Sequence, residues 1–372
     1  MKECVIMKSK LKNMVITVTF LAIIAVLCAA NLLHPDQEIS YTERRKLAQA
    51  PEFTVKTVLD GEAFSEIDEY LTDQFVWRET FRRIKAAANF GVFAKLDNNG
   101  VAIANGSAIK LETELRERAI LNAAAKLNGL YEQYFANNRV FLAVVPEKNY
   151  YLAEKNGYPV MDYEKIAQMV RENLRGEINY IDLFESIDER AYYITDPHWR
   201  QEELQGLLDN LGAAMDFAPA DLSSYEKHKL SPFYGAYYGQ SSLPLSPDDM
   251  FYLTSEYTNA ATAFNYEKNE TKPVYRPELF GGIDPYDIYL SGAAPLLVVE
   301  SPLCKTGKEL IMFRDSFGSS LAPLLLENYS KITLVDIRYM MSAYVGELVE
   351  ITDQDVLFIY SSSVINNSEM LK

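Results

Sequence analysis

The sequence is poor in the residue types that build transition-metal sites. Its 372 residues include three histidines and three cysteines, which are scattered along the chain: His34, His198, His228, Cys4, Cys28 and Cys304. A clustered zinc or copper site is therefore excluded by shortage of ligands. Positive charge is also scarce, because 36 lysines and arginines stand against 52 acidic residues and give a net charge of −16. Such a chain lacks the excess of positive charge that binding to nucleic acid or to anionic lipid head groups requires.

The residues that are present describe a globular chain. Apolar residues make up 48% of the sequence, charged residues 24% and aromatic residues 12%. This balance supports a sizeable core and excludes a disordered chain. At this length, the composition predicts one large domain with an appendage.

One long hydrophobic run lies near the N-terminus. Residues 14–33 (MVITVTFLAIIAVLCAANLL) carry no charge and are long enough, at the rise of an α-helix, to cross about 30 Å of hydrocarbon. Four lysines precede the run, and a short basic segment before the first apolar run normally stays in the cytoplasm. We therefore predict a cytoplasmic tail over 1–13, a single transmembrane anchor over 14–33 and an extracytoplasmic body.

Two other interpretations of this run remain open. A cleaved signal peptide would end at the small residues 28–30, although the full spanning length of the run favours an uncleaved anchor. A lipoprotein is disfavoured because the bulky Leu27 precedes Cys28. With an anchor, Cys304 is the one cysteine of the exported body. No internal disulfide can then form there, which favours a bacterial cell surface over a eukaryotic secretory route.

The rest of the chain divides into a helical stem and an α/β domain. Over 34–98, apolar residues recur at approximate helical spacing and predict the stem. Over 99–372, short β-branched runs alternate with helical patterns, which predicts a mostly parallel sheet with helices on both faces. A long irregular insertion, rich in Ser, Pro, Gly and Tyr, is expected at about 216–292. The expected strands are 139–145, 179–183, 296–299, 309–313, 331–337 and 355–360.

A serine lies where the strand 309–313 turns into a predicted helix. Ser316 follows this strand across the short link 314–315, which places it at the carboxyl edge of the sheet, where α/β proteins gather their functional groups. The helix N-terminal N–H groups beside it can stabilise a developing oxyanion. The position therefore fits a nucleophile, but Asp and Ser before a helix are also ordinary N-caps.

The second candidate is the pair Asp196 and His198 before a predicted helix. An Asp-x-His pair can hold a carboxylate against one imidazole nitrogen while the other nitrogen faces a nucleophile. Asp196 as an N-cap, with Pro197 at the first helical position, explains the same residues structurally. The exported body holds only one other histidine, His228, which lies between lysines in an expected solvated loop. A serine hydrolase-like mechanism would therefore draw its base from His198.

Together these motifs resemble a known family. The run TDPHW at 195–199 is followed, after more than a hundred residues, by RDSF at 314–317 behind an apolar strand. This order resembles the DHHW family and the related alginate O-acetylation proteins with an SGNH hydrolase-like domain. The motif that names the family has two histidines between Asp and Trp, and here the first is Pro197. Further similar stretches are SYTERRKLAQAPEF, DQFVWRETF, VPEK, YDIYLSG and LVDIRYM.

The resemblance implies an SGNH hydrolase-like fold and a serine–histidine–aspartate set. By position, Ser316 matches the nucleophile, His198 the general base and Asp196 the acid that orients the base. The backbone N–H of Ser316 is a natural oxyanion donor. Candidate residues of the substrate or oxyanion pocket are Trp199, Arg338 and Lys148.

The function expected from this resemblance is extracytoplasmic. The enzyme would transfer acetyl groups onto a cell-surface polysaccharide, or hydrolyse them from it, through an acyl-serine. No metal and no cofactor is needed, and the implied partner is a membrane-bound O-acyltransferase that supplies the acetyl group. One alternative is a non-catalytic glycan-binding module, or an envelope or sporulation scaffold, on a degenerate hydrolase fold. Another is a structural protein in which Asp196 and Ser316 are only helix caps.

Overall fold

The computed structural model describes residues 2–372, with side chains from residue 10 onward. Cys4 and the lysines that precede Lys10 in the predicted tail therefore lie outside the described side chains. The chain folds as two compact units: the first ends at Ala88 and the second comprises Asn89–Lys372.

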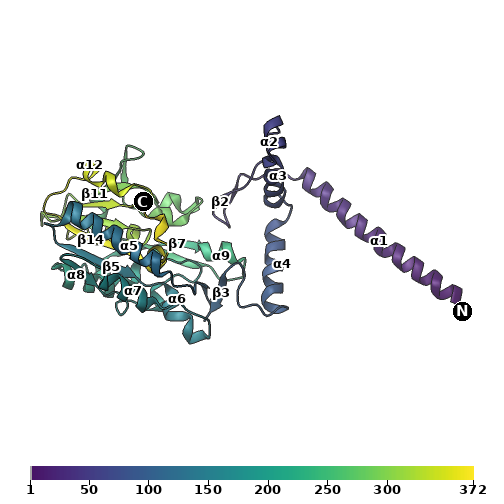
Figure 1. Cartoon of the computed structure of the whole chain (residues 1–372), viewed down its shortest axis with the longest axis horizontal. Coiled ribbons are helices and arrows are strands. Elements are labelled where there is room, and N and C mark those ends of the chain that lie inside the picture. The colour runs from purple at the N-terminus through teal and green to yellow at the C-terminus, as the bar shows by residue number, and fades with distance from the viewer. Residues whose placement is uncertain (1) are drawn as a thin grey trace. The chain divides into compact units, whose positions relative to one another are not determined.

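The first unit is largely helical (Figure 1). Within its long first helix, Lys10–Leu33 is a stretch of 24 residues with a mean hydropathy of 2.5. This stretch is long and apolar enough to span a membrane or to serve as a signal sequence. Shorter helices follow. The elements are α1 (Lys2–Leu33), α2 (Val55–Leu59), α3 (Glu62–Asp73) and α4 (Arg78–Gly91), with the paired short strands β1 (Ile39–Ser40) and β2 (Arg45–Lys46).

The second unit is built on an eight-stranded sheet with the order β10-β9-β11-β13-β12-β14-β5-β6. Neighbours from β13 to β6 are parallel, whereas β11, β9 and β10 extend one edge in antiparallel pairing. The predicted mostly parallel sheet is confirmed, and the antiparallel edge adds to it. The strands are β5 (Val140–Val145), β6 (Ile178–Ile181), β9 (Thr262–Asn265), β10 (Glu270–Pro273), β11 (Leu296–Glu300), β12 (Glu309–Arg314), β13 (Lys331–Val335) and β14 (Asp355–Ser361).

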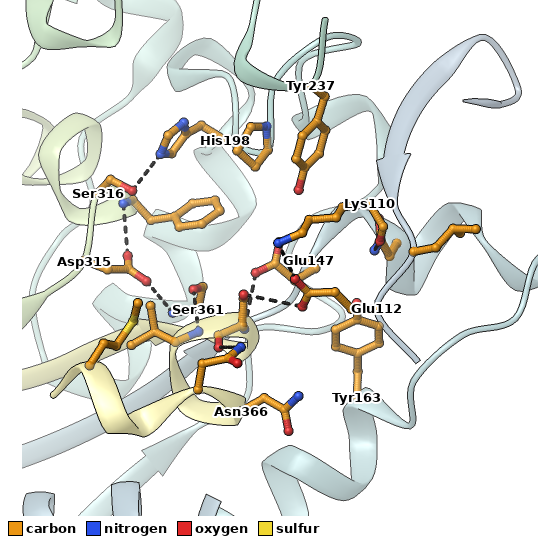
Figure 2. Close-up of a pocket in the computed structure, with 18 of the residues that line it drawn as sticks. Lys110, Glu112, Glu147, Tyr163, His198, Tyr237, Asp315, Ser316, Ser361 and Asn366 are labelled. Carbon is orange, nitrogen blue, oxygen red and sulfur yellow. Dashed lines mark hydrogen bonds and ion pairs between the residues drawn. The ribbon is translucent and has the colours of Figure 1, made fainter. Parts of the chain in front are cut away.

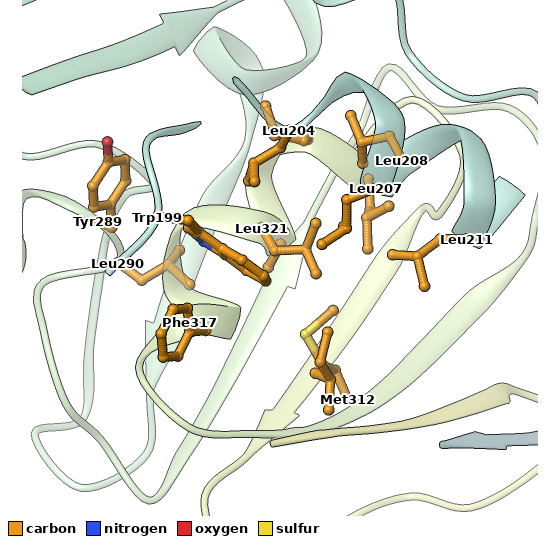
Figure 3. Close-up of a cluster of buried hydrophobic side chains, with 14 of the residues drawn as sticks. Trp199, Leu204, Leu207, Leu208, Leu211, Tyr289, Leu290, Met312, Phe317 and Leu321 are labelled. Carbon is orange, nitrogen blue, oxygen red and sulfur yellow. The ribbon is translucent and has the colours of Figure 1, made fainter. Parts of the chain in front are cut away.

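Helices cover both faces of this sheet. Successive side chains of a strand point to opposite faces, and in β5 Phe141 packs in one buried cluster while Leu142 packs in the other. The first cluster includes α8 and the second includes α5 and α7, so the predicted α/β class is confirmed. Figure 3 shows part of the first cluster, where leucines of α8 face Met312 of β12. The helices are α5 (Glu117–Leu130), α6 (Lys148–Leu152), α7 (Tyr163–Glu172), α8 (Gln205–Met215), α11 (Phe317–Leu321), α12 (Val345–Leu348) and α13 (Ser362–Asn366).

Residues 216–292 are more regular than the sequence predicts. Two of the strands here, β9 and β10, extend the main sheet, and two more form a separate antiparallel pair. Most of β7 is exposed or only partly buried. Its sequence therefore lacks the alternation of apolar and polar residues by which a strand with one buried face is recognised. The further elements are β7 (Glu226–Phe233), β8 (Asp248–Thr254), α9 (Ala236–Ser241) and α10 (Glu256–Ala260).

The second unit begins earlier than the expected end of the stem at residue 98. The Asn89 side-chain amide donates to Asn98 Oδ1 over 2.7 Å, and the Asn98 amide donates to the Ser241 carbonyl over 2.7 Å. These buried hydrogen bonds tie residues 89–98 to the second unit. A small antiparallel hairpin follows, formed by β3 (Val101–Ala104) and β4 (Ser107–Lys110).

Candidate active site

A cavity of about 760 Å³ opens at the carboxyl ends of the parallel strands. Its lining includes residues that follow or end four neighbouring strands: Glu147 after β5, Ser316 after β12, Arg338 after β13 and Ser361 at the end of β14. The segment 110–116 and helix α13 complete the wall (Figure 2). This is the edge at which α/β sheets bind ligands, and the volume lies within the range of about 300–1,000 Å³ that is usual for ligand sites.

The structure brings Ser316, His198 and Asp196 together at this cavity. Ser316 Oγ lies 2.7 Å from His198 Nε2, although the two residues are 118 positions apart in the chain (Figure 2). His198 Nδ1 lies 2.6 Å from Asp196 Oδ1. The His198 side chain is 12% exposed and that of Asp196 is fully buried. With the carboxylate accepting from the Nδ1 proton, Nε2 is left to accept the proton of the serine.

Asp196 is held by backbone donors and caps no helix. Its Oδ1 also accepts from the His198 backbone N–H over 3.1 Å, and its Oδ2 accepts from the Ala236 N–H over 2.8 Å. The helix that the sequence places here, α8, begins only at Gln205. The alternative that Asp196 is an N-cap is therefore wrong.

The loop that carries Asp196 and His198 is anchored by Asp248 of β8 and by Gly235. The Thr195 backbone N–H and hydroxyl donate to Asp248 Oδ2 over 2.8 and 2.6 Å, and the Gly235 N–H donates to Thr195 Oγ1 over 2.8 Å. A Cβ on Gly235 would meet the Thr195 carbonyl oxygen at 2.3 Å and Asp196 Cβ at 2.4 Å. Only glycine permits this close approach of the two chain segments.

The turn that presents Ser316 is fixed by the neighbouring Asp315. Ser316 occupies the N-cap position of α11, but its side chain makes no cap hydrogen bond to that helix, so its hydroxyl does not serve as a helix cap. The buried Asp315 carboxylate accepts from the Phe317 N–H over 3.0 Å and from the Ser361 N–H over 2.8 Å. It thereby joins the ends of β12 and β14 beneath the serine. Sequence reasoning treated Asp315 only as part of a link between strand and helix.

The His198 ring is stacked on Tyr286, a residue that sequence reasoning did not single out. The ring centres are 3.9 Å apart and the planes differ by 12°. The Tyr286 hydroxyl donates to Ser320 Oγ over 2.8 Å, which holds the tyrosine ring in place. Tyr286 lies in the stretch YDIYLSG, one of those that resemble the DHHW family, and that resemblance was the one signal that pointed to it.

Trp199 lies in the core and not in the pocket. Its side chain is fully buried, its Nε1 donates to Ser320 Oγ over 2.8 Å, and its ring packs edge-on against Phe317 (Figure 3). The predicted pocket role of Trp199 is therefore wrong. Trp199 follows His198 directly in the chain, so its buried ring anchors the end of the loop in the hydrophobic cluster.

Lys148 is buried behind the loop and does not line the cavity either. Its Nζ donates to the carbonyl oxygens of Tyr193 and Ile194 over 2.9 and 3.1 Å, and it lies 5.1 Å from the centre of the Tyr237 ring. Burial lowers the pKa of Lys148 to about 7. The predicted pocket role is wrong, because the side chain supports the chain just before Asp196 instead.

Arg338 lines the cavity, as predicted, but its guanidinium forms an ion pair with an acidic residue of the protein. Its guanidinium donates to both oxygens of Asp336, over 2.9 and 2.6 Å, and these bonds counteract the effect of burial and raise the pKa of Arg338.

His228 lies in β7, where its Nε2 is 2.8 Å from Thr254 Oγ1, and it does not line the cavity. Within the part of the chain that the structure describes, no group of three His, Cys, Asp or Glu residues is arranged to hold a metal ion.

Sequence reasoning also missed a second group of polar residues in the cavity. Glu147, Asn149 and Tyr163 line it together with Lys110 and Glu112 (Figure 2). Burial raises the pKa of Glu147 to about 8, and the carboxylates of Glu112 and Asp315 act in the same direction. The VPEK stretch at the end of β5 was the available signal for this group.

Comparisons with known proteins agree with the resemblance that the sequence motifs predicted. A family model described as "DHHW protein" matches residues 161–335, which include the Asp196, His198 and Ser316 positions. No curated protein sequence matches the chain significantly.

Solved structures of two proteins share the fold with TM-scores above 0.5. A DHHW family protein from Eubacterium siraeum is 21% identical, with 74% of this chain and 95% of that chain covered and a TM-score of 0.62. PatB1 of Bacillus cereus is 16% identical over 73% and 98% of the two chains, with a TM-score of 0.59; a second structure of PatB1, with a sulfonyl adduct, gives 0.56. The O-acetyltransferase domain of Pseudomonas putida AlgJ is 14% identical over 72% and 92%, with a TM-score of 0.42. The resemblance predicted from the motifs is confirmed, because residues 161–335 match the DHHW family model.

Proposed function

We propose that this protein is an acetyl-transfer enzyme that acts through an acyl-serine on Ser316. The observation that carries the proposal is the continuous hydrogen-bonded chain from Ser316 Oγ through the His198 ring to the buried Asp196, at the wall of a ligand-sized cavity. This is the arrangement that activates a hydroxyl for attack on an ester.

In the first half-reaction, His198 Nε2 takes the proton of Ser316 as Oγ attacks the carbonyl carbon of the acetyl donor. The bond from the acetyl carbon to the leaving oxygen then breaks, and the imidazolium returns the proton to that oxygen. The Asp196 carboxylate stabilises the imidazolium that forms between the two proton transfers. The acetyl group is left on Ser316.

In the second half-reaction, an acceptor hydroxyl gives its proton to His198 Nε2 and attacks the acetyl-serine. The Ser316 Oγ–acetyl bond breaks and the proton returns to Ser316, so the enzyme is regenerated. A sugar hydroxyl as acceptor gives transfer, and water gives hydrolysis. The resemblance to the DHHW and alginate O-acetylation proteins supports acetyl as the group and a cell-surface polysaccharide as the acceptor.

The predicted organisation of the chain places this chemistry outside the cytoplasm. In the proposal, residues 1–13 stay inside, residues 14–33 span the membrane as an uncleaved anchor, residues 34–98 form the stem and residues 99–372 form the catalytic domain. The long apolar helix α1 supports an anchor. A membrane-bound O-acyltransferase that delivers acetyl across the bilayer is the proposed donor partner.

The test is turnover of an acetyl ester by the purified protein and by Ser316→Ala. We expect the variant to lose at least about a thousandfold in kcat, because no other group forms the acyl intermediate. Ser224→Ala, a change at an exposed serine of the same unit, is the matched control and should keep the wild-type rate. Mass spectrometry after a short incubation should find the acetyl group on the peptide that contains Ser316.

The possible results separate the proposed function from its alternative. Equal rates for the wild-type protein and Ser316→Ala would overturn the role of Ser316. Absence of turnover together with absence of an acetylated serine would favour the non-catalytic glycan-binding or scaffold module.

A further inference from the structure

The cavity continues beyond Ser316 into a second, polar part, here called the polar lobe, which is defined by Glu147, Asn149 and Tyr163. These side chains come from the start of α6 and the start of α7. All three residues are more than nine-tenths buried, with 7%, 6% and 1% of their surface exposed. They line the same cavity as Ser316 and His198. In Figure 2, the Tyr163 ring points toward Glu112 and Glu147.

Two oxygen atoms of the polar lobe accept or donate no hydrogen bond of standard geometry among residues 2–372. They are Tyr163 Oη and Asn149 Oδ1. The Asn149 amide nitrogen is engaged, because it donates to the Lys110 carbonyl. Buried polar atoms in native proteins are nearly always hydrogen-bonded. Both residues line the cavity, so a ligand that enters it can supply the missing partner.

Glu147 is the third polar group without a strong partner. Its Oε1 accepts a long bond of 3.4 Å from the Ser363 N–H, and no lysine or arginine of the described chain lies within ion-pair distance of its carboxyl. The nearest cation that influences it, Lys110, is paired with Glu112 over 2.7 Å. Burial, followed by the Glu147 carboxylate, raises the pKa of Tyr163, and the neighbouring Asn149 side chain acts in the opposite direction.

We propose that Glu147, Asn149 and Tyr163 form an acceptor subsite that hydrogen-bonds the hydroxyl groups of an uncharged sugar residue. The inference rests on the proposed function and deepens it by naming the class of acceptor. A sugar hydroxyl both donates and accepts, so it can donate to Asn149 Oδ1 and exchange hydrogen bonds with the phenol of Tyr163. A protonated Glu147 carboxyl can likewise both donate and accept.

The charges around the polar lobe disfavour an anionic sugar. A uronate placed there would face the carboxylates of Glu112 and Asp315, and like charges in a buried site repel strongly. The cations of the cavity wall do not offset this repulsion, because each already faces an acidic residue: Lys110 with Glu112, Arg116 with Glu114, and Arg338 with Asp336.

The test is equilibrium binding of oligosaccharides to the purified full-length protein in detergent. The uncharged probes are cellopentaose and chitopentaose, and the anionic probe is tetragalacturonate. We expect at least one uncharged probe to bind more tightly than tetragalacturonate. Tyr163→Phe should weaken that binding by about five- to tenfold, because one hydrogen bond to the ligand is lost. The matched control Tyr134→Phe, at a tyrosine outside the cavity, should bind as the wild type does.

Thermal unfolding separates a binding role for Tyr163 from a structural one. Because Tyr163 Oη makes no hydrogen bond of standard geometry in the described protein, Tyr163→Phe should keep or raise the melting temperature, whereas loss of a structural hydrogen bond would lower it. Equal binding by the wild-type protein and Tyr163→Phe, tighter binding of tetragalacturonate, or binding of none of the probes would overturn the subsite. Failure of the proposed function is seen separately, as absence of acetyl on Ser316. An acetylated Ser316 without binding of an uncharged probe overturns the subsite alone.

Discussion

His198 is the residue on which the proposed chemistry depends. The sequence identified the residue itself, and the structure identified the groups that orient its ring. The scarcity of histidine pointed to His198 before any geometry was known. Its orientation is set by Asp196 of the same loop at one nitrogen and by groups from two distant parts of the chain, Ser316 at the other nitrogen and Tyr286 against the ring face. Tyr286 follows the loop by more than eighty residues. No local pattern links it to His198, so sequence reasoning missed it.

Glu147 gives a prediction for stability at the scale of a single residue. Its pKa rises from the ordinary 4.5 to about 8 on folding, because of burial and the nearby carboxylates. Between these values the unfolded chain has lost the proton that the folded chain keeps. Raising the pH from 5 to 8 therefore favours the unfolded chain. Glu147→Gln should remove this dependence and increase the free energy of unfolding at pH 7 by roughly 3 kcal/mol relative to its effect at pH 4.

Urea unfolding at several pH values, followed by the fluorescence of the buried Trp199, measures this difference. Glu154→Gln, at an exposed glutamate, is the control and should leave the pH dependence as in the wild type. Parallel pH profiles for the wild-type protein and Glu147→Gln would show that Glu147 is ionised throughout this range in the folded state.

At the scale of elements, the buried strands of the main sheet were predicted well. The six expected strands are all present, with ends shifted by a few residues. Their apolar runs are local features, and burial against helices requires them. The segment 195–199 was predicted less well, because Asp followed by Pro is also a good helix start. The side-chain bonds of Thr195 to Asp248, together with the Asp196–His198 pair, hold it as a loop instead.

Gly235 gives a prediction at this scale. In Gly235→Ala, the new methyl group would overlap the Thr195 carbonyl and Asp196 Cβ, so the loop must shift away from α9. We expect a loss of about 1–3 kcal/mol in the free energy of unfolding, as is usual for overpacking. A loss of about tenfold or more in kcat should accompany it, because Asp196 moves relative to His198.

The control for this change is Gly281→Ala, since a Cβ at Gly281 would have no heavy atom within 4 Å. Chemical unfolding and acetyl-ester turnover of both variants measure the two effects. Wild-type kcat in Gly235→Ala would mean that the loop and α9 adjust without moving the catalytic carboxylate.

At the scale of the whole molecule, the two units carry separate parts of the proposed function. The first holds a helix that is apolar enough to span a membrane, and the second holds the sheet and the complete candidate site. The negative net charge of the chain suits a domain that works on a surface polymer rather than on nucleic acid.

Cysteine labelling in intact cells tests the predicted topology. Ser224→Cys introduces an exposed thiol in the second unit, and a membrane-impermeant maleimide should label it without permeabilisation. The natural Cys4 in the predicted tail should be labelled only after permeabilisation. Labelling of both only after permeabilisation would place the body in the cytoplasm, and a mature protein that lacks the residues up to a cleavage point within 28–30 would favour the cleaved signal peptide.

The sequence by itself determined the features that depend on local pattern. The alternation of apolar strands and helices predicts the α/β class, the length and hydropathy of residues 14–33 predict a membrane-spanning or signal helix, and the motifs around His198 and Ser316 predict the family. These features can be read from neighbouring residues because periodicity and chain length act over short distances.

Only the tertiary structure decided which side chains meet. It brought Ser316 to 2.7 Å from His198 across 118 positions of the chain, buried Trp199 and Lys148 away from the cavity where sequence reasoning had placed them, and assembled the polar lobe around Glu147. The physical reason is that burial and partnership depend on which elements converge at the edge of the sheet. That convergence is a property of packing across the whole domain, and no single stretch of sequence contains it.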